Sequence, residues 1–91
     1  MAEYHWVNVK SRHPDAYRAE GVDHEECRVE IIWTLHPGIK QQHRVVASLT
    51  YQGGSLWRVE KRFMRLNSAT HFFWRMKGQA EDRLRKLNCA D

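Results

Sequence analysis

The sequence predicts an α+β fold of two layers, in which a three-stranded antiparallel meander packs against one long C-terminal amphipathic helix. Apolar residues alternate along CRVEIIWTLH and RVVASLTY, which is the pattern of half-buried strands. After residue 67 the apolar residues recur at helical spacing. The length of 91 residues provides for one domain, residues 1–91, with a single modest core.

Residues 1–26 carry weaker signals. Residues 4–10 are rich in β-forming side chains, so an extra N-terminal strand can join the meander. Pro14 suits the first position of a helix and Gly21 the residue just past its end, which predicts one or two helical turns over residues 14–20. Residues 22–26, VDHEE, are expected to form an acidic loop.

The meander is expected over residues 27–66, with turns at Pro37-Gly38 and in the segment QGGS. At the second turn, an odd-numbered loop of three or five residues, with a glycine at positive φ in a bulge, pairs apolar residues across the strands. The expected pairs are Tyr51 with Trp57, Leu49 with Val59 and Val45 with Phe63, and Lys61 then lies opposite Ala47. A rival interpretation makes residues 55–66 a helix, because Leu56, Val59, Phe63 and Leu66 also fit a helical stripe; the cross-strand pairing favours a strand.

The last element is predicted to be an amphipathic helix over residues 68–88, capped by Asn67 or Ser68. The core predicted from this arrangement takes ten residues from the sheet and five from the helix. They are Val29, Ile31, Trp33, Leu35, Val45, Leu49, Tyr51, Trp57, Val59 and Phe63, and Phe72, Phe73, Met76, Ala80 and Leu84.

The charge of the chain is uneven. Residues 1–45 hold six Lys/Arg and seven Asp/Glu, whereas residues 46–91 hold nine and four, so the net charge of +4 comes from the second half. Such a field suits an anionic partner, either nucleic acid or an acidic protein surface. No apolar run is long enough for a membrane span and no signal core is visible, so we expect a cytoplasmic protein with reduced Cys27 and Cys89 and no membrane partner.

The sequence offers little for catalysis. It has no strained nucleophile turn, no phosphate-cradling loop with Lys and Ser/Thr, and no obvious pair of acids, so we expect no enzymatic activity and no cofactor. The residues His24, Cys27, His36 and His43 are metal-ligand types, but their spacing matches no compact zinc site, and we expect no metal.

Two groups of residues are better suited to binding. One is the outer face of the sheet, from which Arg44, Arg58, Arg62 and Arg65 could contact phosphates or bases. The other is the outer side of the helix, with Trp74, Lys77 and Arg85, of which the tryptophan would be a recognition hot spot or be covered by the N-terminal segment. The neighbouring Ile32 and Val46 form an alternative patch for protein contact.

A meander whose last strand ends RFMRLNSAT and leads into an amphipathic helix resembles three kinds of protein in its order of elements, over residues 27–88. AP2-type and integrase arm-binding domains use such a sheet to read DNA, and double-stranded-RNA-binding domains also place a meander before a C-terminal helix. Several small phage proteins that inhibit bacterial defence complexes have this form too. The RNA-binding type would have a basic cluster where this chain has SATHFF.

These observations favour a small, basic, non-enzymatic module that binds nucleic acid through its arginine-bearing sheet face. The alternative is a stand-alone inhibitor or adaptor of the phage anti-defence type that docks on a larger nucleic-acid-processing complex. The exposed sheet edges would also allow a symmetric homodimer.

Overall fold

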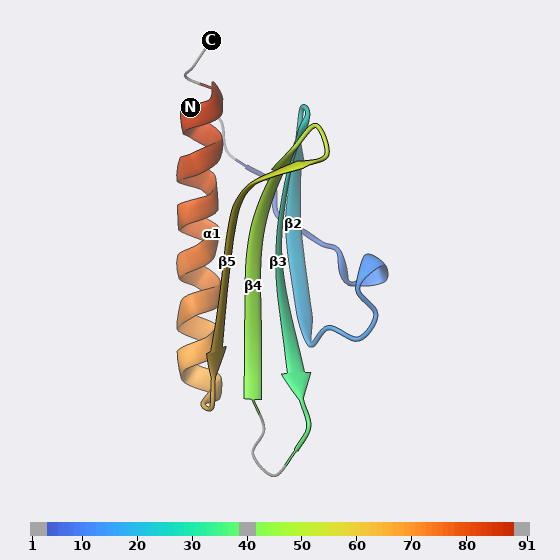
Figure 1. Cartoon of the computed structure of the whole chain (residues 1–91), viewed down its shortest axis with the longest axis vertical. Coiled ribbons are helices and arrows are strands. Elements are labelled where there is room, and N and C mark those ends of the chain that lie inside the picture. Colours follow the sequence, from blue (N-terminus) through green and yellow to red (C-terminus); the bar gives the residue numbers. More distant parts are fainter. Residues whose placement is uncertain (1–3, 39–41, 89–91) are drawn as a thin grey trace.

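The computed structural model describes residues 4–38 and 42–88. Within them the strands form one antiparallel sheet in the order β1-β2-β3-β4-β5, and a helix follows (Figure 1). The elements are β1 (Val7–Asn8), the 3-10 turn η1 (Lys10–Arg12), β2 (Arg18–His24), β3 (Cys27–His36), β4 (Gln42–Tyr51), β5 (Gly54–Phe63) and α1 (Leu66–Asn88). The two-layer α+β class is confirmed, but the sheet has five strands where three were predicted.

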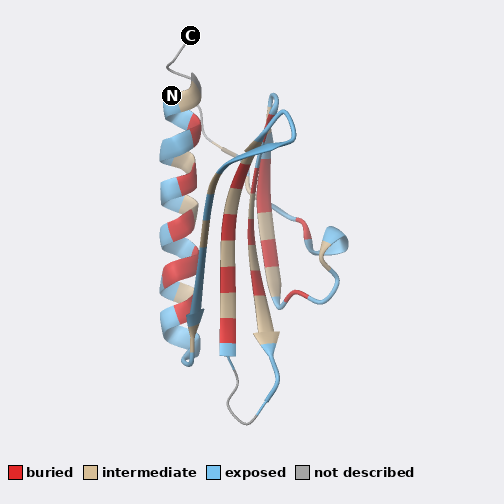
Figure 2. Cartoon of the chain, viewed as in Figure 1, coloured by how far each residue is buried: buried red, intermediate tan, exposed pale blue. Residues whose placement is uncertain are grey.

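The main core lies between the sheet and α1, as the alternation of buried residues along β3 and β4 shows (Figure 2). The helix packs mainly over these two strands. The inner face of β5 is therefore only half buried, at Trp57, Val59 and Phe63. Two further residues of the predicted core differ from the prediction, because Leu35 is half buried and Tyr51 is 40% exposed; the rest of the predicted core is buried.

The N-terminal segment wraps around the β2 side of the sheet. Trp6 packs against the core on the helix side, and β1 then pairs with β2. Beyond β1 the chain crosses to the outer face, where Val9, Ala16 and Ala19 form a small second core with Ile32. Both faces of the sheet are thus covered near β2, whereas only the inner face is covered near β4.

The helical turn predicted over residues 14–20 is wrong, and the acidic loop predicted over residues 22–26 is reduced to a two-residue turn at Glu25 and Glu26. The only 3-10 turn in the described chain comes earlier, at η1, and residues 18–24 form β2. Gly21 lies within this strand rather than past a helix end. A Cβ atom there would lie 2.7 Å from the backbone oxygen of Val29, so glycine permits the close approach of β2 to β3.

Residues 54–63 form a strand, which settles the choice between strand and helix in favour of the predicted strand. The hairpin differs in detail: Tyr51 pairs with Gly54 around a two-residue turn, and both turn residues, Gln52 and Gly53, have positive φ (50° and 83°). The register then shifts by one residue at Leu56, so Leu49 lies opposite Trp57 and Lys61 opposite Val45. The positive-φ glycine therefore sits in the turn and not in the bulge. The predicted pairs are displaced by two residues, so the side chains from Trp57 to Phe63 stay on their predicted faces.

The helix begins at Leu66, so Asn67 and Ser68 lie inside its first turn and do not cap it. Pro37 and Gly38 follow β3 as predicted for a turn, and the rest of that connection lies outside the described residues.

Candidate nucleic-acid interface

Three arginines surround one carboxylate on the outer face of β4 and β5. Arg44 binds Glu60 through two hydrogen bonds of 2.9 Å, from Nε to Oε2 and from Nη2 to Oε1. Arg58 Nη2 donates to the same Oε1 at 3.0 Å, and Arg62 Nε lies 3.9 Å from Oε2. We call these four residues the Glu60 cluster.

The Glu60 cluster arises from the alternation of β5. Residues 58, 60 and 62 share one face of the strand, and Arg44 reaches them from β4, where it lies directly opposite Arg62. Two arginines in directly opposed positions repel each other. Glu60, which lies opposite Val46, bridges the pair diagonally, so a single carboxylate serves three guanidinium groups.

The electrostatics of the cluster follow from these contacts. Hydrogen bonds from Arg44 and then Arg58 lower the pKa of Glu60 to about 2, and the bond to Glu60 raises the pKa of Arg44. Glu60 is therefore ionised at neutral pH. Three guanidinium groups against one carboxylate leave an excess of two positive charges, which the cluster itself does not neutralise.

The cluster is accessible from solvent. The side chains of Arg58 and Arg62 are 53% and 59% exposed, while that of Arg44 is 31% exposed beneath them. Ser48 lies opposite Arg58 on the same face. Arg65 follows β5 in the connection to α1 and is also exposed. These residues form the predicted basic face.

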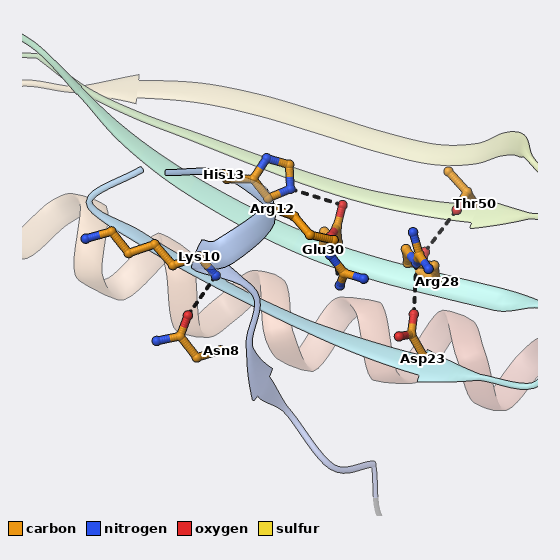
Figure 3. A network of polar contacts seen from close by, with 8 residues as sticks. All are labelled: Asn8, Lys10, Arg12, His13, Asp23, Arg28, Glu30 and Thr50. Carbon is orange, nitrogen blue, oxygen red and sulfur yellow. Dashed lines mark hydrogen bonds and ion pairs between the residues drawn. The ribbon is translucent and has the colours of Figure 1, made fainter. Parts of the chain in front are cut away.

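A second polar network lies on the outer face, at the β2–β3 side (Figure 3). The Glu30 carboxylate forms an ion pair with Arg12, with 3.1 Å between Oε2 and Nη2, and a hydrogen bond of 3.4 Å between Oε1 and Nε2 of His13. These contacts hold the segment around η1 over the sheet. Arg28 binds Asp23 at 2.9 Å, so its charge is paired. This network lies on the same face of the sheet as the Glu60 cluster. Because Asp23 neutralises Arg28, Arg28 does not add to the excess positive charge of that face.

The predicted patch of Ile32 and Val46 is only partly available. The two residues are directly opposite each other, as expected. Ile32, however, packs against the second core under the N-terminal segment, and both side chains are half buried.

The predicted helix residues lie in the other layer and do not join the sheet face. Lys77 is only 13% exposed: its Nζ donates to Glu20 at 2.7 Å and lies 5.0 Å from the Trp6 ring and 4.3 Å from the Trp74 ring. Arg85 is paired within the helix, with Asp82 at 2.6 Å. Trp74 is 53% exposed, so the N-terminal segment does not cover it.

The residue types that suggested a metal are dispersed. Among the described residues no group of three or more His, Cys, Asp or Glu side chains could hold an ion. His43 is buried, and its Nδ1 accepts a hydrogen bond from Trp33 Nε1 at 3.1 Å. Burial raises the pKa of the Cys27 thiol, and the nearby Glu25 and Glu26 act in the same direction. Cys89 lies outside the described residues.

The arginines of the Glu60 cluster were predicted from the sequence, but the carboxylate at its centre was not. The signal for Glu60 was present, because it stands two residues from both Arg58 and Arg62 on one strand face. The Trp6–Lys77–Trp74 stack had no such signal, since it depends on the path of the N-terminal segment.

No helix in the described part of the chain combines the length and apolar character that a membrane crossing requires. Comparison of the chain with protein-family models, with curated proteins and with solved structures gives no match. The function is therefore inferred from the geometry of the Glu60 cluster and its surroundings.

Proposed function

We propose that the protein is a non-enzymatic, cytoplasmic module that binds nucleic acid through the outer face of β4 and β5. The observation that carries this proposal is the excess of two positive charges on three arginines that converge on one carboxylate. An external phosphate would supply the missing counter-charge. Glu60 meanwhile keeps the guanidinium groups in place, which reduces the entropy lost when they bind.

The exposed arginines are the contacts of this interface. Arg58 and Arg62 exchange part of their interaction with Glu60 for phosphate oxygens, while Arg44, held by two bonds, positions the carboxylate. Ser48 and Arg65 lie at the margin of this interface and can add hydrogen bonds to the sugar-phosphate backbone of the nucleic acid. The face is a sheet without a covering helix, the kind of element that can enter the major groove of a duplex.

The number of phosphates neutralised sets the salt dependence. Two or three contacts predict a slope of about −2 to −3 in log K against log salt. Between about 50 and about 200 mM salt the affinity should then fall by roughly 15- to 60-fold. A purely generic attraction to a basic surface would show no dependence on which arginines are present.

The test is fluorescence anisotropy of labelled duplex DNA, single-stranded DNA and duplex RNA at several salt concentrations. Saturable binding to one class is expected, and the double variant Arg58→Ala/Arg62→Ala should weaken it and flatten the salt slope by about 2. The matched control Arg75→Ala/Arg85→Ala removes the same charge from the helix layer and should have little effect. Equal losses in both double variants would contradict the proposal.

A second candidate function is docking on a larger nucleic-acid-processing protein complex as an inhibitor or adaptor. The observation that favours it is Trp74, a large aromatic side chain that is 53% exposed and lies close to the cations of Lys77 and Arg18. Fixed, exposed aromatic residues are typical hot spots of protein interfaces. In this case Trp74→Ala would abolish partner binding, and bare DNA or RNA would bind weakly and without class preference.

A further inference from the structure

A cavity of about 250 Å³ opens between the C-terminal half of α1 and the start of β5. It is lined by Leu49, Leu56, Trp57, Arg83, Lys86 and Leu87. It lies on the helix side of the sheet and shares no residue with the Glu60 cluster. We call it the α1–β5 cavity.

The cavity exists because α1 packs over β3 and β4 and leaves the inner face of β5 half covered. The bulge in β5 adds to this effect, since the extra residue, Leu56, has no partner on β4 and is 53% exposed. Leucine and tryptophan side chains thus line an opening that water can reach, although burying them would be favourable.

The residues that line the α1–β5 cavity indicate which kind of ligand it would bind. Four of its six residues are apolar and the other two are cations, with no carboxylate among them. The Arg83 guanidinium lies 5.2 Å from the centroid of the Trp57 ring and occupies one face of the indole. An apolar side chain with a carboxylate beside it would satisfy both parts of the cavity.

The free edge of β5 runs beside the cavity. β5 is the last strand of the sheet, and no described residue pairs with its outer edge. Its backbone groups on that side can accept a further strand. Lys61 points to the inner face, with its Nζ 5.8 Å from the Phe63 and Phe72 rings, so β5 itself carries a cation on the side of α1.

The positive charge of the cavity and of β5 favours an acidic segment over a second copy of this chain as the occupant. A second copy of this chain, paired edge to edge, would bring another Lys61, Arg83 and Lys86 to the same region. An acidic segment would instead neutralise these cations. An inward-pointing lysine on an edge strand also disfavours pairing with an apolar strand.

We propose that the α1–β5 cavity and the edge of β5 bind an extended acidic segment of a partner protein, which adds to the sheet beside β5. An apolar side chain of the segment enters the cavity, and its carboxylates pair with Arg83 and Lys86. The cavity lies on the opposite face of the sheet from the Glu60 cluster and shares no residue with it.

The probe is a fluorescein-labelled nine-residue peptide in which two leucines, two positions apart, are flanked by glutamates. We expect saturable binding to the full chain and no binding of the peptide with lysines in place of the glutamates. The double variant Arg83→Glu/Lys86→Glu should weaken binding about tenfold or more. The control Arg75→Glu/Arg85→Glu changes the net charge equally on other positions of α1 and should weaken it much less.

Further readouts separate this site from the nucleic-acid face. The variant Arg58→Ala/Arg62→Ala should keep the peptide affinity within about threefold, and ¹⁵N NMR should place the amide shifts on β5 and the end of α1. Equal weakening in the two charge-reversal variants, shifts confined elsewhere, or a wild-type dimer whose β5 edges pair would each overturn the proposal.

Discussion

Lys77 joins the two layers of the fold through contacts that a surface lysine would not have. It extends from α1 to Glu20 on β2, with its Nζ 2.7 Å from the Oε1 of that carboxylate. The side chains are only 13% and 16% exposed. The indole rings of Trp6 and Trp74 lie 5.0 Å and 4.3 Å from the ammonium group. Replacing Lys77 with methionine keeps much of the apolar stem and removes the charge.

The structure sets the size of the effect. A hydrogen bond to a charged group contributes about 1.5–3 kcal/mol, and each cation–π contact adds about 0.5–1 kcal/mol. Part of this is retained, because Arg18 Nε continues to bind Glu20, at 2.6 Å, and because methionine packs against the rings. We therefore expect Lys77→Met to lower the free energy of unfolding by about 2 kcal/mol, or roughly 8–16 °C in Tm for a domain of this size.

The assay is urea unfolding followed by far-UV circular dichroism, with a double-mutant cycle between Lys77→Met and Glu20→Gln. We expect a coupling energy of about 1–2 kcal/mol. The control Arg85→Met breaks an exposed pair within α1 and should change stability by less than about 0.5 kcal/mol. A Lys77→Met effect as small as that of the control, or strictly additive single effects, would show that the Lys77–Glu20 contact does not stabilise the fold.

The same pair predicts a pH dependence. Burial raises the pKa of Glu20, but its bonds to Lys77 and Arg18 outweigh this effect, so the pKa lies below its usual 4.5. A carboxylate with a depressed folded-state pKa stabilises the fold above its unfolded pKa and loses this contribution as the pH falls. The coupling energy measured at neutral pH should therefore decline when the cycle is repeated below about pH 4.5.

Three further outcomes are expected from single positions. Gly21→Ala should destabilise the protein by about 1–3 kcal/mol in the same urea assay, because its Cβ would meet the Val29 oxygen at 2.7 Å; an unchanged midpoint would contradict this. The stability difference between wild type and Glu60→Gln should shrink as the pH falls from 4.5 to about 2, the pKa of Glu60, because protonation weakens its bonds to the arginines. A stability difference that stays constant over this pH range would contradict this. The Cys27 thiol should react with a thiol reagent only at the rate of local opening, since it is buried and its pKa is raised; mass spectrometry showing fast labelling at Cys27 would exclude this.

The sequence was informative where one face of a strand is buried and the other is in water. That holds for β3, β4 and β5, so their faces and the positions of the arginines were predicted. It does not hold for β2, which is covered on both sides, by α1 and by the N-terminal segment. Two inward-pointing residues of β2, Arg18 and Glu20, are charged, and the fold accommodates them because Glu20 pairs with Lys77 and Arg18 lies over aromatic rings of α1. The alternation of apolar and polar residues that marks a strand is therefore absent from the sequence of β2.

The site shows the same division. Arg44, Arg58 and Arg62 lie on one face because of strand alternation, which can be derived from the sequence. Arg44 lies directly opposite Arg62 only in the observed register, which is displaced by two residues from the predicted one. The withdrawal of Lys77 from solvent could not be derived, because it requires Trp6, 71 positions away, to lie against α1. The exposure of Leu56 follows from a one-residue bulge that the hairpin residues alone do not locate.

The most direct test of the nucleic-acid proposal is an NMR titration of ¹⁵N-labelled protein with a short duplex DNA at low salt. It locates the bound face, which affinity alone does not. We expect saturable shifts in the Nε–H signals of Arg58 and Arg62 and in the amides of β4 and β5, with α1 largely unaffected. Shifts confined to α1, or small shifts spread over all basic residues, would contradict it.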